Sequence, residues 1–210
     1  MKYATAVQEL KRALSGPLAE ARAMALMSPR TLTGDALRGR GPRPNARQAG
    51  ALVLLFPDAA EEAVFVLTER SPHLPAHPGQ IGLPGGMQAA GESLERTALR
   101  EAEEEIGIDA KAVIFLGALS SVYIPPTDIV LHPFVGHLES PPVMRALPRE
   151  VTRIFEVPLA ALLDAESIHT ERRELPMGEA IVPYFHLAEQ IIWGATAIVL
   201  AELRALLVDA

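Results

Sequence analysis

Residues 86–108 read GMQAAGESLERTALREAEEEIGI, a glycine-containing loop that leads into an acid-rich segment. Ser93 is a suitable N-cap, and the apolar residues that follow it recur at helical spacing as far as Ile106. Gly107 then supplies the stop that is common just beyond the last helical residue. The stretch therefore predicts a helix from about Ser93 to Ile106, and we interpret the rest of the chain as its scaffold.

Three glutamates of this segment, Glu101, Glu104 and Glu105, are spaced so that they share one face of the helix. A run of like charges is usually a solvated face. Clustered carboxylates also suit hard divalent cations such as Mg²⁺ and Mn²⁺. Strict apolar spacing, a double glycine in front, and a Glu92 that Arg100 can reach all favour a metal site.

The stretch resembles the Nudix box, which is written as Gly, five residues, Glu, seven residues, Arg-Glu, an aliphatic residue, any residue, Glu-Glu, any residue, Gly and an aliphatic residue. The fixed positions are filled by Gly86, Glu92, Arg100, Glu101, Glu104, Glu105, Gly107 and Ile108, with Ala102 at the first aliphatic one. A spaced pattern with so many fixed identities is rarely met by chance. The resemblance covers roughly residues 46–206.

The resemblance implies roles for the acidic residues. In Nudix enzymes the first and last glutamates of the Arg-Glu…Glu-Glu run bind metal, which corresponds here to Glu101 and Glu105. The main-chain carbonyl of Gly86 is implied as a further ligand. Glu104 would serve another metal ion or activate water. The expected cofactor is Mg²⁺ or Mn²⁺.

Other residues would support this chemistry. Arg100, paired with Glu92, would tie the loop to the helix and hold the carboxylates in place. Gly85 and Gly86 would let the backbone approach metal and phosphates closely. Glu150 belongs to a later segment that also resembles the family, and it is either a general base that swings toward the cluster or an exposed surface residue.

Residues 67–86 are rich in proline and glycine, which predicts an irregular loop, and loops of this length are usually functional. They resemble the signature of the coenzyme A pyrophosphatase branch of the Nudix family. Its matching positions are Thr68, Arg70, Ser71, Gly79, Pro84, Gly85 and Gly86. The resemblance implies that the substrate is bound by Arg70, Ser71, Gly79 and Gly85.

Two positions depart from this signature: Pro75 replaces an arginine and Leu83 replaces a phenylalanine. The proline removes a cation and several hydrogen-bond donors that would serve the substrate's phosphates. The nearest residues that could compensate are His73, His77 and the linker arginines Arg38, Arg40, Arg43 and Arg47.

Composition limits the alternatives. The chain has 210 residues, 49% of them hydrophobic, which is enough for one well-buried domain. Its net charge of -7 gives no support to general binding of nucleic acid or anionic membranes. The lack of cysteine excludes disulfides and thiolate metal sites. No segment is long and apolar enough to span a bilayer, and the first residues lack a secretory core, so we expect a cytoplasmic protein.

We expect two regions, an N-terminal appendage over residues 1–45 and a Nudix hydrolase domain over residues 46–210. One or two short amphipathic helices, interrupted at Gly16-Pro17, are predicted up to about residue 27. They either cap the domain or join two copies in a homodimer. The following Arg/Pro/Gly-rich segment is either a flexible linker or an arm along the substrate channel.

Strands are expected at 49–56, 63–68, 112–121, 129–138, 167–170 and 180–186, with loops at 122–128 and 141–148. The first two strands are almost continuously apolar, which indicates a sheet buried between helices. A closing helix is expected from Trp193 to about Val208, and the tryptophan either stacks on an adenine or belongs to the core. The fold class is α/β, and the resemblance implies an α/β/α sandwich around a mixed curved sheet.

The leading hypothesis is a metal-dependent hydrolase of a nucleoside diphosphate derivative. Its most favoured substrate is coenzyme A or acyl-coenzyme A, which would give 3′,5′-ADP and 4′-phosphopantetheine or its acylated form. Hydrolysis of ADP-ribose or a dinucleotide is the alternative if Pro75 abolishes recognition of coenzyme A. A Nudix-fold binding module without catalysis is a second alternative, although it would not need crowded glutamates. In each case the partner is a small nucleotide, with no nucleic acid or membrane involved.

Overall fold

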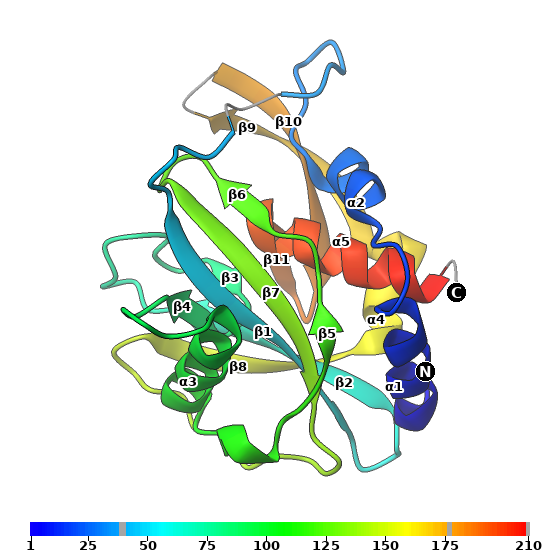
Figure 1. The fold of residues 1–210 in the computed structure, drawn as a ribbon. Helices are drawn as coiled ribbons and strands as arrows, with labels where there is room; N and C mark the ends of the chain where they lie inside the picture. The colour runs from blue at the N-terminus through cyan, green and yellow to red at the C-terminus, as the bar shows by residue number, and fades with distance from the viewer. Residues whose placement is uncertain (38–40, 176–177, 209–210) are drawn as a thin grey trace.

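The computed structural model describes residues 1–37, 41–175 and 178–208 (Figure 1). Its helices are α1 (Tyr3–Ala13), α2 (Glu20–Met27), α3 (Leu94–Ile106), α4 (Leu159–Leu163) and α5 (Gly194–Val208). Its strands are β1 (Arg47–Pro57), β2 (Ala63–Arg70), β3 (Ile81–Gly82), β4 (Gly85–Met87), β5 (Ile114–Ala118), β6 (Val122–Ile124), β7 (Ile129–His137), β8 (Val151–Pro158), β9 (Ile168–Leu175), β10 (Gly178–Leu187) and β11 (Gln190–Trp193).

The larger sheet is mixed. Its strand order is β3-β2-β1-β7-β5, with β4 also paired to β1, β6 to β7 and β8 to β2. Strands β1 and β7 run parallel, while β1 pairs with β2 and β4 in the antiparallel sense. A smaller antiparallel sheet has the order β11-β10-β9. The central pair β1 and β7 thus lies in the middle of the larger sheet.

Strand β1 is buried on both faces, as its continuous hydrophobicity predicts. Successive side chains of a strand point to opposite faces, so Leu52 and Leu54 pack into one core with α3. Val53 and Leu55 pack into a second core with α1, α4 and α5. Helices lie on both sides of the sheet (Figure 1), which confirms the predicted α/β/α sandwich.

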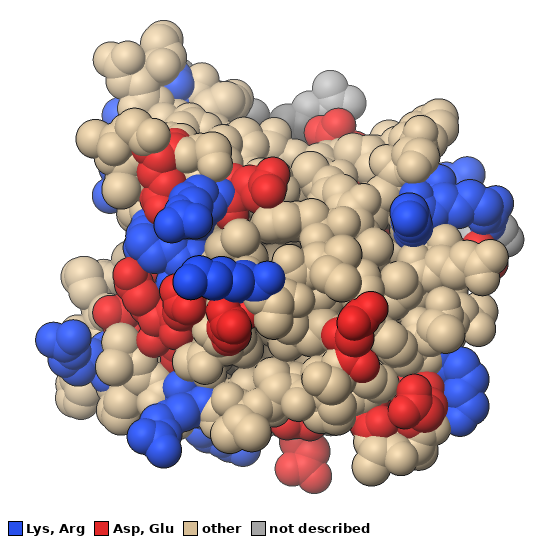
Figure 2. Space-filling model, turned by 60° about the horizontal axis from the view of Figure 1, so that its bottom comes forward, with Lys and Arg blue, Asp and Glu red and all other residues tan. Residues whose placement is uncertain are grey.

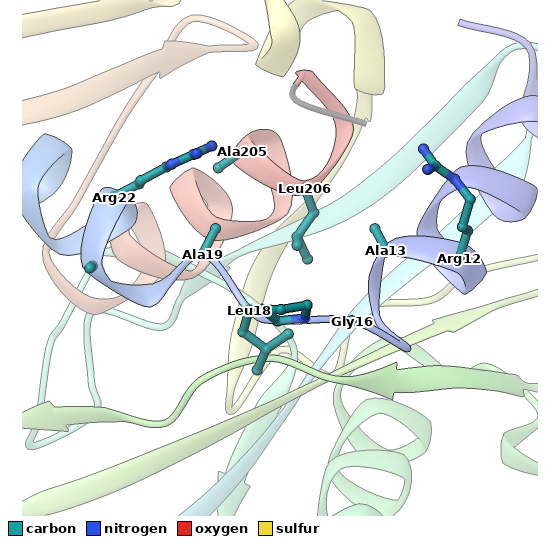
Figure 3. A pocket seen from close by; sticks show the side chains of 10 residues that line it. Arg12, Ala13, Gly16, Leu18, Ala19, Arg22, Ala205 and Leu206 are labelled. Atoms are coloured by element: carbon teal, nitrogen blue, oxygen red, sulfur yellow. The ribbon is translucent and has the colours of Figure 1, made fainter.

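Helices α1 and α2 are separated at Gly16-Pro17, as predicted, and both join the second core. Leu10 of α1 and Met27 of α2 are fully buried there with residues of α5. An open cavity of about 500 Å³ lies between the two helices and α5, with Leu18 and Leu206 in its wall (Figure 3). None of the residues that line this cavity belongs to the predicted site.

Several short strands were missed by the sequence analysis. Residues 122–128, expected to be a loop, contain β6, which pairs with β7. Strands β3 and β4 occur at the end of the expected 67–86 loop, and β11 ends at Trp193, where the closing helix was expected to begin. Such strands are too short to carry an alternating pattern, and pairing with neighbours decides their conformation.

The linker arginines are only partly described. Arg38 and Arg40 lie outside the described residues. Arg43 is 3.9 Å from the carboxylate of Asp128, and Arg47 donates to the carbonyl of Thr127, so both lie against the loop after β6. Within the described ranges, no helix combines the length and apolarity needed to cross a membrane.

Candidate active site

Helix α3 is fixed at both ends and along its buried face. The Ser93 hydroxyl accepts a hydrogen bond from the Arg96 backbone N–H at 3.2 Å, and Gly107 ends the helix with a left-handed φ of 74°. Gly50 of β1 allows the helix to approach the sheet, because a Cβ there would lie 2.5 Å from the carbonyl oxygen of Leu94. The acidic residues of α3 are therefore held beside β4.

A cluster of three carboxylates forms next to this helix. Glu101 and Glu105 from α3 and Glu150 from the loop before β8 each contribute an oxygen, and these oxygens lie within 4.8 Å of one another. The backbone of Glu150 is held by Ser71, whose N–H donates to the Glu150 carbonyl at 2.8 Å. The long loop before the glycines thus helps to position the third carboxylate.

Glu105 is the most deeply buried member, with only 3% of its surface exposed. Burial raises the pKa of its carboxyl to about 7, while the Gly85 N–H at 3.0 Å and the Arg70 guanidinium at 4.0 Å oppose that rise. The neighbouring Glu101 and Glu150 raise it further. A divalent cation would favour the ionised form of this carboxylate.

Glu101 lies against the backbone of Gly86. Burial raises the pKa of Glu101, and a 2.7 Å hydrogen bond from Arg100 opposes that rise. A Cβ on Gly86 would come within 2.3 Å of the Glu101 carboxylate, so only glycine leaves this space free. Hard oxygen donors around a space without side chains fit Mg²⁺ or Mn²⁺.

Arg100 joins the loop to the helix, as expected. Its Nε and Nη2 donate to the two oxygens of Glu92 at 3.0 and 3.1 Å, and Nη2 also donates to the Met87 carbonyl at 3.2 Å. Its Nη1 donates to Glu101 and, at 3.4 Å, to Glu104. The Arg100 hydrogen bonds lower the pKa of Glu92 to about 2. One guanidinium therefore holds the loop and two helix carboxylates together.

The other residues predicted for the site differ in their burial and in their contacts. Glu104 is exposed and is not a member of the three-carboxylate group. Arg70 faces Glu105, and its Nε has no hydrogen-bond partner among the described residues. Ser71 is fully buried: its N–H donates to the Glu150 carbonyl, and its hydroxyl accepts a hydrogen bond from the His73 N–H at 3.4 Å. Gly79 is exposed, and its N–H donates to the Arg70 carbonyl.

Acidic and basic side chains alternate on the side of the molecule where α3 lies (Figure 2). Sequence reasoning identified the charged residues of the site itself: Glu92, Arg100, Glu101, Glu105, Glu150 and Arg70. It did not identify Gly50. An isolated glycine within an apolar strand is the signal that could have indicated this close approach.

Gly86→Ala is expected to lower activity sharply while the protein stays folded. The new Cβ would displace the Glu101 carboxylate, which is the end of a flexible side chain and can move out of the cluster. We expect kcat/KM to fall at least about tenfold, because displacing a metal-site group typically costs 10–100-fold. Gly41→Ala is the matched control, since nothing lies within 4 Å of a Cβ there. Equal activity of the two variants would contradict the assigned position of Glu101.

Comparison with known proteins identifies related sequences. The model of the NUDIX domain matches residues 46–176. A protein from Photorhabdus laumondii named uncharacterized Nudix hydrolase NudL is 37% identical over 164 residues, covering 76% of this chain and 84% of that protein. The peroxisomal coenzyme A diphosphatase ndx-8 of Caenorhabditis elegans is 36% identical over 121 residues, covering 56% of this chain and 51% of its own length.

A solved structure supports the fold. The MutT/nudix family protein from Enterococcus faecalis aligns with a TM-score of 0.52 at 17% identity, covering 100% of this chain and 75% of the other. At that identity the likeness concerns the fold alone.

Proposed function

Because this chain belongs to the Nudix hydrolase family, we propose that it hydrolyses the diphosphate of coenzyme A or acyl-coenzyme A. The products would be 3′,5′-ADP and 4′-phosphopantetheine or its acylated form. The observation that carries the proposal is the carboxylate cluster of Glu101, Glu105 and Glu150, whose oxygens lie within 4.8 Å of one another. We take residues 46–210 as the catalytic unit and residues 1–45 as an N-terminal addition whose helices α1 and α2 pack on α5.

Mg²⁺ or Mn²⁺ would be held by the carboxylates of Glu101 and Glu105, with the Gly86 carbonyl as a further ligand. When bound, the metal supplies charge neutralisation of the diphosphate and a lowered pKa of coordinated water. The donor set is entirely oxygen, as these cations prefer. Burial of Glu105 makes its carboxylate costly without a cation and so supports this assignment.

The side chains of this protein would perform the remaining tasks. A water molecule attacks phosphorus, its proton passes to a carboxylate, and the bond from phosphorus to the bridging oxygen breaks. Glu150 is the proposed acceptor of the proton, because it lies in the cluster but comes from a separate loop. Arg70, beside Glu105, would face the substrate's phosphates. Arg100 holds the glycine loop in place against α3 through its bonds to Glu92 and the Met87 carbonyl.

Two residues are candidates for activating water, Glu150 and Glu104. Replacing each by Gln should show which of them accepts the proton. We expect Glu150→Gln to lower kcat by about 10²–10⁴-fold, the usual contribution of a general base. Glu104→Gln should cost less, because its carboxylate is exposed and its hydrogen bond from Arg100 is long, at 3.4 Å. Single-turnover rates at saturating substrate measure both effects. A larger loss in Glu104→Gln would move the proton acceptor to that residue.

Two observations favour coenzyme A among diphosphates. The residues from Thr68 to Gly86 match most of the branch signature, and one relative is named a coenzyme A diphosphatase. Pro75, which replaces the signature arginine, is exposed in the same loop. If that replacement abolishes recognition, ADP-ribose or a dinucleotide is the substrate, with the same chemistry at the same carboxylates.

The test is a substrate panel with Mg²⁺ or Mn²⁺, comprising coenzyme A, acetyl-coenzyme A, ADP-ribose, NADH and diadenosine polyphosphates. We expect the highest kcat/KM for the coenzyme A compounds, with 3′,5′-ADP released and identified by chromatography. Faster cleavage of another diphosphate would overturn the proposed substrate but would still support the proposed hydrolysis of a diphosphate. No cleavage with either metal would favour the binding module.

A further inference from the structure

The outer face of the smaller sheet carries a row of rings. The register pairs His169 with Tyr184 and Tyr184 with Trp193, so the three rings lie in line across β9, β10 and β11. The opposite face of the sheet, with Phe185 and Ile192, is fully buried in the second core. The row therefore points away from the core, with His169 exposed and the other two rings partly exposed.

These rings are arranged for face contacts. The centroids of His169 and Tyr184 are 5.4 Å apart with an interplanar angle of 27°. His186 meets His169 edge-on at 6.0 Å, and the Arg173 guanidinium lies 4.4 Å from the centroid of Trp193. The whole chain has only three tyrosines and one tryptophan. Two of those four rings thus lie side by side on one open sheet face.

Cross-strand ring pairs can serve only to stabilise a sheet. The position of this row relative to the carboxylate cluster is therefore what indicates that it binds a ligand. Strand β11 runs beside β3 of the larger sheet (Figure 1). At the start of α5, the Thr196 hydroxyl lies 3.7 Å from the position of a Cβ on Gly82. Strand β3 leads directly to Gly85, whose N–H donates to Glu105. Strand β11, which ends at Trp193, therefore contacts the strand that leads into the glycine loop of the carboxylate cluster.

We propose that the row of His169, Tyr184 and Trp193 is a stacking site for the base of the nucleotide substrate. The inference rests on the proposed function, which places the diphosphate at the carboxylate cluster. Ring faces stack on nucleobases. The Arg173 guanidinium over Trp193 is paired with the Glu171 carboxylate, so stacking rather than charge would hold the base. Because every base has a π face, the row selects nucleotides over sugar phosphates more than one base over another.

The only tryptophan of the chain reports on this site directly. Metal-free protein is titrated with AMP, 3′,5′-ADP or ribose 5-phosphate while Trp193 is excited at the red edge of its absorption, where adenine does not absorb. We expect saturable quenching by the two nucleotides and none by ribose 5-phosphate. Quenching is independent of turnover, so it tests the row even if the proposed substrate is wrong.

A pair of variants separates binding from folding. Tyr184→Ala is expected to weaken nucleotide binding about tenfold, near the low end of the range for base–aromatic stacking. It should raise KM by a similar factor and leave kcat unchanged. Ile114→Ala, which truncates an exposed apolar side chain on β5, is the control for surface apolar truncation. Circular dichroism confirms that both variants fold.

Three results would overturn the inference. The first is unchanged Trp193 emission throughout the titrations with AMP and 3′,5′-ADP. The second is equal quenching by ribose 5-phosphate, which would show that the base is not required. The third is emission that changes with protein concentration alone, together with a dimer in analytical ultracentrifugation, because the row would then be an interface between two copies of this chain.

Discussion

Glu105→Gln is expected to remove at least about 99% of the turnover, because groups that merely support a metal ligand already contribute 10–100-fold. Glu105 is 3% exposed and lies in the cluster with Glu101 and Glu150. The amide keeps the shape of the side chain and can still accept the hydrogen bond from Gly85, so the fold should be retained. Initial rates with Mg²⁺ and thermal unfolding without metal provide the two measurements.

The matched control for this variant is Glu103→Gln, two positions away on the exposed face of the same helix. It makes the same Glu-to-Gln change without touching the cluster, so near-normal turnover is expected. Full activity of Glu105→Gln would contradict its assignment as a metal ligand. Equal losses in both variants would show that the helix responds to net charge rather than to a site.

Arg100→Lys is expected to lower kcat/KM by about 10–100-fold, the usual cost of losing a group that orients metal ligands. Lysine keeps the charge but cannot form the paired bonds to Glu92 at 3.0 and 3.1 Å together with the bond to the Met87 carbonyl. The Glu101 carboxylate and the glycine loop should both become less ordered. If the variant only binds metal more weakly, saturating metal should restore its rate. If the metal ligands are misplaced, the rate should stay low at saturating metal.

Arg96→Lys on the exposed face of α3 is the control for this substitution. The double variant Arg100→Lys with Glu92→Gln should lose little beyond Arg100→Lys alone, since both changes break one pair and their effects are not additive. Fully additive losses would contradict a shared role of the two residues.

The helix and its caps could be predicted from the sequence because each signal is local. Ser93 and Gly107 have the conformations that their positions predict, and Arg100 reaches Glu92 across a loop within the same motif. The two long strands β1 and β2 were equally clear, since a continuous apolar run indicates burial on both faces. Local patterns of this kind do not depend on distant parts of the chain.

The parts that sequence reasoning missed depend on contacts between distant segments. Strand β6 exists because it pairs with β7, and β11 because it pairs with β10. From the sequence, Glu150 is either a general base or an exposed surface residue. Only the three-dimensional arrangement brings it to the carboxylates of α3. Ser71 is fully buried and its N–H donates to the distant Glu150 carbonyl, a contact that no local pattern predicts.

The most direct test of the central claim is a titration with Mn²⁺ followed by electron paramagnetic resonance, in which bound ions lose the signal of the free cation. Wild-type protein should bind Mn²⁺ saturably, and Glu105→Gln should bind it at least about tenfold more weakly, whereas Glu103→Gln should match the wild type. Equal affinity in all three proteins would contradict a metal site at Glu101 and Glu105.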